Sequence, residues 1–249
     1  EEKFRQMENQ TWYKGDAHQL EHLYKTRYAY QIYPDYGFWR VVNTNLPRAH
    51  YPMPSMISNA FSSVLFSNRP NFTVDSGSMA RDKKHTDRLE QIFAVNDILT
   101  LLQESAQLQS YSGGVAFKIN LDSTITDVPL ITAYPKEQYY VHKKYGQTIY
   151  IDFFDEYGKY TLRSRYGRGY IAYNLFLGTK EANLDAVEET ADLKDIAFID
   201  SERNLIPFLF ATEIPNKGHG HSDYEGLITS FHALDETYSS MINYIRKTK

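Results

Sequence analysis

Three residues with metal-binding side chains stand at alternate positions near the C-terminal end of the sequence: His219, His221 and Asp223. Imidazole nitrogens and carboxylate oxygens are common zinc ligands, and a bound zinc ion would activate a water molecule for hydrolysis. Downstream of these residues only His232 could add another imidazole, and two glycines leave the loop loosely organised. A zinc-dependent hydrolase is therefore the alternative function that the sequence suggests.

A second candidate metal site is the H-x-x-E-H pattern formed by His18, Glu21 and His22. In one class of zinc peptidases this pattern supplies two histidine ligands and a glutamate base. Here the surrounding segment is short and polar, so we expect a solvated helix face. The sequence has no Ser-x-x-Lys, Gly-x-Ser-x-Gly, phosphate-loop or dinucleotide-binding pattern. We therefore expect a protein that is not an enzyme and that needs no metal or cofactor.

Composition narrows the class of protein further. The 249 residues are 42 % hydrophobic, contain no cysteine and carry a net charge of −4. No apolar run approaches the roughly 18 residues of a membrane span, so we expect no membrane partner. The negative charge argues against tight, non-specific binding of nucleic acid, which depends on neutralising phosphates. The 21 tyrosines leave open a tyrosine-rich binding module as a further possibility.

The stretch from His221 to Lys249 predicts a long amphipathic helix. Its apolar residues recur every three or four positions, as in a coiled-coil seam: Tyr224, Leu227, Phe231, Leu234, Tyr238, Met241 and Ile245. Ser222 and Glu225 have the spacing of a capping box, so the helix is expected to start there. The pattern still runs at Lys249, which predicts that the chain was cut from a longer protein.

The preceding sequence predicts helices followed by a sheet. Helices are expected at 16–30, 55–66 and 87–109, and the second has an apolar face formed by Ile57, Phe61, Val64 and Leu65. A strand is expected at 36–42, and alternating patterns beyond Val115 predict further strands at 115–120, 130–133, 139–142, 148–155, 160–166, 170–177, 195–199 and 205–211. The expected fold class is α+β, with N-terminal helices, an antiparallel hairpin-rich sheet and a long C-terminal helix.

Taken together, these signals resemble the portal proteins of tailed bacteriophages, in the branch common in phages of Gram-positive hosts. The resemblance lies in the order of the motifs: Trp12-Tyr13-x-Gly15, then VLFSNRP at Val64–Pro70, then YSGGVAFK at Tyr111–Lys118, and finally IPFLFATEIPNKGHGHSDYEGLI leading into HALDETYSSMINYIR. The last segment is the most specific of these motifs.

The resemblance implies a structural protein that forms a ring of about a dozen copies around double-stranded DNA as the genome is packaged and ejected. Residues 1–221 would be a wing-like domain and 222–249 the start of a stem helix, with the family's other domains beyond Lys249. The implied location is the capsid portal vertex of the virion, after assembly in the host cytoplasm. The implied partners are further copies of the chain, the packaging ATPase, the capsid and head-completion proteins.

The resemblance also assigns residues to the helix that would meet neighbouring copies or line the channel: Ser222, Asp223, Tyr224, Glu225, Leu227, Phe231, Leu234, Asp235, Tyr238, Met241 and Ile245. Its apolar stripe fits two arrangements equally well, because a helix packed on the chain's own core shows the same periodicity. Since some of each contact would lie beyond Lys249, we do not expect this chain alone to close a ring.

Overall fold

The computed structural model describes residues 2–32, 37–39, 48–75, 77, 79–122, 125–197, 209–218 and 220–248. The chain divides into two compact units. Unit 1 comprises Glu1–Ser67, Ala106–Gly114 and Pro215–Lys249, and unit 2 comprises Asn68–Ser105 and Val115–Ile214. This division differs from the expected one at 221/222, because the C-terminal helix shares a core with the N-terminal helices.

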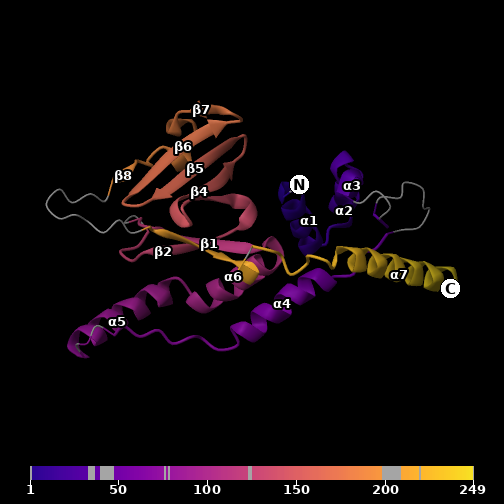
Figure 1. The fold of residues 1–249 in the computed structure, drawn as a ribbon, viewed down its shortest axis with the longest axis horizontal. Helices are drawn as coiled ribbons and strands as arrows, with labels where there is room; N and C mark the ends of the chain where they lie inside the picture. The colour runs from indigo at the N-terminus through magenta and orange to yellow at the C-terminus, as the bar shows by residue number, and fades with distance from the viewer. Residues whose placement is uncertain are drawn as a thin grey trace. The chain divides into compact units, whose positions relative to one another are not determined.

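Unit 1 is helical and is built around an aromatic core. Its helices are α1 (Glu2–Lys14), α2 (Ala17–Tyr24), α3 (Arg27–Ile32), α4 (Met53–Leu65), the end of α6 (Ile98–Ser112) and α7 (Ile228–Lys247), as Figure 1 shows. The most deeply buried large side chains of this core include Trp12, Leu20, Tyr24 and Tyr224. Trp12 Nε1 donates a 2.7 Å hydrogen bond to the hydroxyl of Tyr24, so the buried indole N–H has a partner.

Unit 2 holds the sheets. Among its described residues, a three-stranded sheet has the order β2-β1-β9, formed by β1 (Gly114–Asn120), β2 (Leu130–Pro135) and β9 (Ala211–Pro215). A larger sheet has the order β3-β4-β5-β6-β7, formed by β3 (Tyr139–Lys144), β4 (Gln147–Tyr157), β5 (Tyr160–Gly167), β6 (Tyr170–Leu177) and β7 (Lys180–Ala182), and β8 (Ile196–Ala197) pairs with β6. The strand pairs of this larger sheet are antiparallel. Its core face carries Ile151, Phe153 and Tyr166.

The α+β prediction is confirmed, including the antiparallel hairpins and the long C-terminal helix. The β3–β4 turn shows why the sequence identified these hairpins: Tyr145 has φ +52° and Gly146 has φ +76°, the pair of left-handed residues that a tight hairpin turn requires. The strands expected at 36–42 and 205–211 fall mostly outside the described residues.

The helix expected at 87–109 is two helices. α5 (Met79–Val95) ends before Asp97, whose φ of +41° is not helical. Asn96 fixes the break, because its side-chain amide donates to the carbonyls of Ile92 and Pro129 at 2.8 and 2.9 Å. The amide oxygen of Asn96 accepts from Ile131 N at 2.7 Å. A polar residue inside an apolar helical pattern therefore ties the helix break to β2.

The capping-box prediction is wrong, because α7 begins at Ile228 and residues 223–227 form turns. The hydroxyl of Ser222 accepts from Tyr224 N at 3.0 Å and donates to the Ser110 carbonyl at 3.1 Å. Gly226 has φ +79°, a left-handed conformation that interrupts a helix. The apolar periodicity runs through these turns, so the sequence pattern did not show the break.

Candidate functional site

The predicted cluster of His219, His221 and Asp223 is only partly described, because His219 lies outside the described residues. His221 Nδ1 lies 2.6 Å from Glu225 Oε2. Asp223 instead accepts from Asn216 Nδ2 at 3.1 Å and pairs with Lys217 Nζ at 3.0 Å. The two described members therefore interact with different partners, and the portion of the chain that the structure describes holds no group of three residues able to bind a metal ion.

The His18, Glu21 and His22 pattern lies on α2, with both histidines exposed. Asp16 caps this helix by accepting from the backbone N–H of His18 at 2.8 Å. Glu21 Oε1 pairs with Lys25 Nζ at 2.8 Å and lies 3.6 Å from an Arg48 nitrogen. The hydrogen bond from Lys25 lowers the pKa of Glu21. A glutamate held between cations is poorly suited to act as a base, which agrees with the expected solvated helix face.

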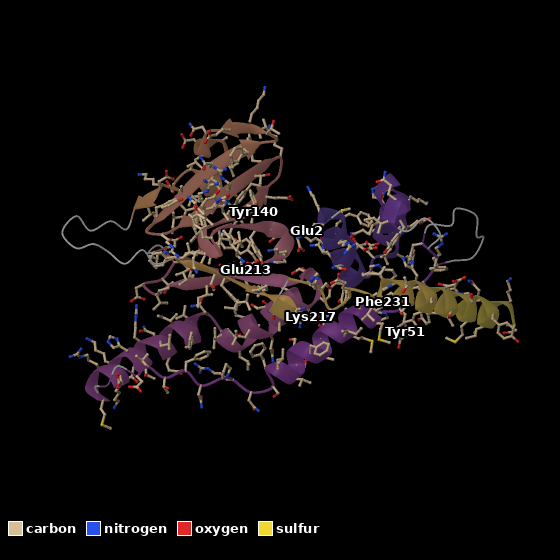
Figure 2. All side chains as sticks on the ribbon, in the orientation of Figure 1. Glu2, Tyr51, Tyr140, Glu213, Lys217 and Phe231 are labelled. Atoms are coloured by element: carbon tan, nitrogen blue, oxygen red, sulfur yellow. The ribbon has the colours of Figure 1, made fainter. Side chains whose placement is uncertain are left out.

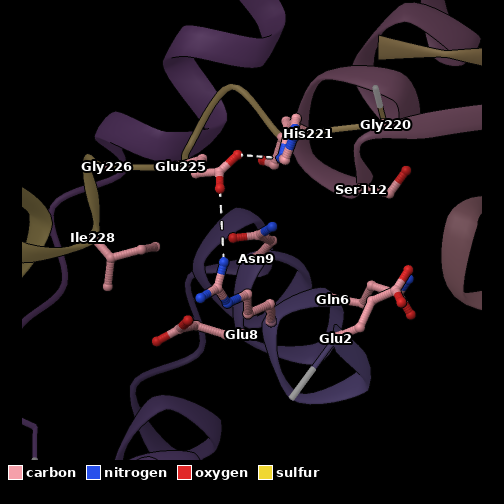
Figure 3. A pocket seen from close by; sticks show the side chains of 12 residues that line it. Glu2, Gln6, Glu8, Asn9, Ser112, Gly220, His221, Glu225, Gly226 and Ile228 are labelled. Carbon is pink, nitrogen blue, oxygen red and sulfur yellow. Dashed lines mark ion pairs between the residues drawn. The ribbon is translucent and has the colours of Figure 1, made fainter. Parts of the chain in front are cut away.

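A polar pocket of about 640 Å³ in unit 1 adjoins the predicted C-terminal site (Figure 3). It lies between α1 and the loop before α7. Glu225 pairs with His221 within that loop and reaches α1 through Arg5, whose Nη1 is 3.7 Å away. The two serines in the lining face backbone carbonyls: Ser112 Oγ lies 2.7 and 2.6 Å from the carbonyl oxygens of Leu108 and Gly114, and Ser222 donates to that of Ser110.

The most tightly organised feature of unit 1 is the buried face of α7. Asp235 is 1 % exposed, and its carboxylate accepts from Trp39 Nε1 at 3.0 Å and from Tyr51 N at 2.8 Å, and lies 2.9 Å from His50 Nδ1. One turn later, Ser239 accepts from Ala49 N at 2.9 Å and donates to its carbonyl at 3.1 Å. These bonds fasten residues 49–51 along α7, and Tyr51 lies against that helix in Figure 2.

His232 belongs to the same buried face and packs edge-on against aromatic rings. Its ring centroid lies 5.1 Å from that of Trp12 and 4.5 Å from that of Tyr24. Burial lowers the pKa of His232 to about 4, and the charge of Asp235 acts in the opposite direction. The imidazole is therefore neutral at pH 7 and serves as a component of the core.

The predicted apolar seam of α7 is not the buried face. Of the seam residues, Tyr224 and Phe231 are buried, Leu234 and Tyr238 are half-buried, and Leu227, Met241 and Ile245 are 37, 53 and 46 % exposed. The buried side chains of the helix are Ile228, Phe231, His232, Asp235, Ser239 and Asn243. At 3.6 residues per turn, the two faces are centred roughly 110° apart. Among the other predicted positions, Ser222 is buried, Asp223 half-buried and Glu225 exposed.

α4 likewise leaves most of its apolar face exposed. The buried residues of α4 are Pro54, Ser58 and Ser62. Ser58 Oγ lies 2.8 Å from the Tyr224 hydroxyl, which donates to the Pro54 carbonyl at 2.7 Å. Of the apolar face expected from the sequence, Phe61, Val64 and Leu65 are 54, 76 and 65 % exposed, and Ile57 alone packs against the core.

The buried face of α4 could have been recognised from the helical spacing of its serines. Ser55, Ser58 and Ser62 recur at helical spacing, but small polar residues are usually read as the solvent side. Burial of Ser58 depends on hydroxyl partners that come from distant positions in the chain, Ser110 at 3.0 Å and Tyr224 at 2.8 Å. Those partners cannot be inferred from the helix itself.

Comparison with known proteins adds no identification: no protein-family model matches the chain, and no curated protein matches its sequence. Within the described residues, the helices are too short or too polar to cross a membrane.

Proposed function

We propose that this chain is the wing and first stem helix of a bacteriophage portal, a structural ring at the capsid vertex through which double-stranded DNA is packaged and ejected. In this proposal the neighbours are further copies of the chain, together with the packaging ATPase, capsid and head-completion proteins. The motif order from Trp12 to the terminal helix motivates the choice of family. The protein would act in the virion and would carry out no reaction itself.

The observation that supports an assembly role is the orientation of α7. Its polar residues Asp235 and Ser239 point into the core, where they have hydrogen-bond partners, while Met241 and Ile245 point out. A helix that served its own core alone would bury its apolar seam and expose its polar face. Exposed apolar surface of this kind marks an interaction site.

Sedimentation velocity of the complete gene product tests this assignment. The wild type is expected to sediment as a large, discrete oligomer. The double substitution Met241→Glu and Ile245→Glu places two carboxylates in the seam and should shift most of the protein to monomer, because burying unpaired charges at a contact is costly.

A matched control places the same charges elsewhere on the helix. Thr229 and Ser240 are exposed and lie roughly 140° from the centre of the seam, so Thr229→Glu with Ser240→Glu should leave the oligomer intact. A wild type that sediments as a monomer would contradict the proposed function. Stoichiometric zinc in the dialysed protein would instead favour the hydrolase that uses His219, His221 and Asp223.

A further inference from the structure

We propose that one end of the larger sheet in unit 2 binds a short segment of single-stranded nucleic acid. The site combines the β3–β4 and β5–β6 turns with the sheet face turned away from the core, and its main residues are Tyr140, Lys144, Tyr145, Tyr150, Arg168 and Tyr170. This inference does not depend on the proposed ring, because all of these residues belong to unit 2 of a single copy.

A row of residues crosses three strands of this sheet on the face opposite the core. Ile151 lies in the core, so its neighbour Tyr150 points to the other face. Tyr150 pairs with Gly167, and Gly167 pairs with Tyr170. A Cβ added to Gly167 would lie 2.2 Å from ring atoms of Tyr170, so this ring lies directly over the glycine. The row therefore brings the ring of Tyr170 next to Tyr150.

Planar side chains gather around this row. The rings of His142 and Tyr150 are stacked, with centroids 4.7 Å apart and an interplanar angle of 4°. On Tyr150 also lies the guanidinium of Arg165, 4.0 Å from the ring centroid. Three further rings at this end of the sheet are open to solvent: Tyr140, Tyr145 and Tyr170 are 61, 93 and 37 % exposed. Unpaired bases bind proteins by stacking on exposed aromatic rings of this kind.

Two cations at the same end of the sheet can meet phosphate groups. Lys144 ends β3 and Arg168 follows β5, and both turns lie together because β4 begins where β5 ends. Both side chains are exposed, and neither forms an ion pair with another residue that the structure describes. The carboxylate of Asp152 on this face is already held by Arg165, whose Nε and Nη2 donate to its two oxygens at 2.7 and 2.8 Å. This end is therefore locally positive, although the chain carries a net charge of −4.

These groups suit a single strand better than a duplex or a glycan. In a duplex each base is covered by its neighbours, so the protein meets phosphates and groove edges and the exposed rings have no base face to stack on. A glycan needs free carboxylate or amide groups for its hydroxyls, and the carboxylate of Asp152 is occupied. Three open rings beside two cations match about three unpaired nucleotides.

Fluorescence anisotropy of the complete gene product with a labelled thymidine oligonucleotide of about 12 nucleotides tests this site at low salt. The wild type is expected to bind the single strand and to prefer it to a duplex of the same length. Tyr145→Ala should weaken binding at least about five-fold, the lower limit for stacking of one base on an aromatic ring. Tyr145→Phe keeps the ring and should bind like the wild type.

The Lys144→Ala/Arg168→Ala protein tests the two cations. Contacts to two phosphates predict a slope of about −1.4 when the logarithm of the binding constant is plotted against that of the salt concentration. The double variant should bring this slope towards zero. Lys159→Ala is the matched control, because Lys159 is exposed in the β4–β5 turn at the opposite end of the same sheet, and it should leave binding unchanged.

Several results would overturn this inference. Equal affinity for single strand and duplex, or undiminished binding by Tyr145→Ala, would show an electrostatic contact without stacking. Displacement of the oligonucleotide by a neutral oligosaccharide would identify a glycan surface instead. Absence of binding by the wild type at low salt would remove the site altogether. Each of these results leaves the portal proposal standing, because that proposal depends on contacts of unit 1.

Discussion

Removing the carboxylate of Asp235 is expected to destabilise unit 1 strongly. In Asp235→Ala the indole N–H of Trp39 and the backbone N–H of Tyr51 lose their acceptor, and His50 loses its neighbour at 2.9 Å. A buried donor left without an acceptor costs about 1 to 3 kcal/mol, and breaking a buried charged network costs about 3 to 5 kcal/mol. We therefore expect the free energy of unfolding to fall by about 3 to 5 kcal/mol.

Urea unfolding followed by tryptophan fluorescence measures this change in the right unit, because both tryptophans of the chain, Trp12 and Trp39, belong to unit 1. Glu236→Ala is the matched control, since Glu236 is the next residue on the same helix and is exposed. The control should change the free energy of unfolding by less than about 0.5 kcal/mol. A loss below about 1 kcal/mol for Asp235→Ala would show that the network does not hold α7 in place.

Three further predictions concern the same unit. The His232 pKa of about 4 in the folded protein lies below the unfolded value of 6.5, so protonation of His232 favours the unfolded chain. The contribution of His232 to stability is therefore full above pH 6.5 and falls as the pH drops towards 4. In urea titrations at a series of pH values, His232→Phe should show a flatter dependence of stability on pH than the wild type. Gly113→Ala places a Cβ 2.3 Å from the Gly220 carbonyl oxygen, whereas Gly226 also has a positive φ but has nothing within 4 Å of its added Cβ. Gly113→Ala should therefore lower the free energy of unfolding by at least about 1 kcal/mol more than Gly226→Ala. Equal losses of stability for the two variants in fluorescence-detected unfolding would contradict this prediction. Tyr224→Phe removes the hydroxyl between Ser58 and Pro54 and should cost about 1 to 2 kcal/mol in the same assay, with no loss counting against the buried serine face of α4.

Local sequence patterns predicted where helices and strands lie along the chain better than which residues those elements contact. Alternating residues and turn residues such as Tyr145-Gly146 identified the hairpins, because strand pairing across a tight turn is decided by neighbouring residues. Helical spacing also located α4 and α7 correctly along most of their length. The break at Asn96 was missed, since it depends on hydrogen bonds to Pro129 and Ile131 in another element.

The buried faces of the helices could not be predicted from periodicity. Ser58 on α4 and Asp235 and Ser239 on α7 are buried with partners from Tyr224, Trp39 and residues 49–51, which come from remote positions in the sequence. The signal that could have been used is the second stripe itself: Asp235, Ser239 and Asn243 recur every four residues, beside the apolar seam. Two stripes on one helix indicate two partners, one of which can be another copy.

Negative-stain electron microscopy of the complete gene product tests the central claim most directly. We predict rings of about a dozen copies with a central hole wide enough for double-stranded DNA, and loss of these rings in the Met241→Glu/Ile245→Glu protein. Compact particles without a central hole would contradict this claim, provided that tryptophan fluorescence shows unit 1 of the same protein to be folded.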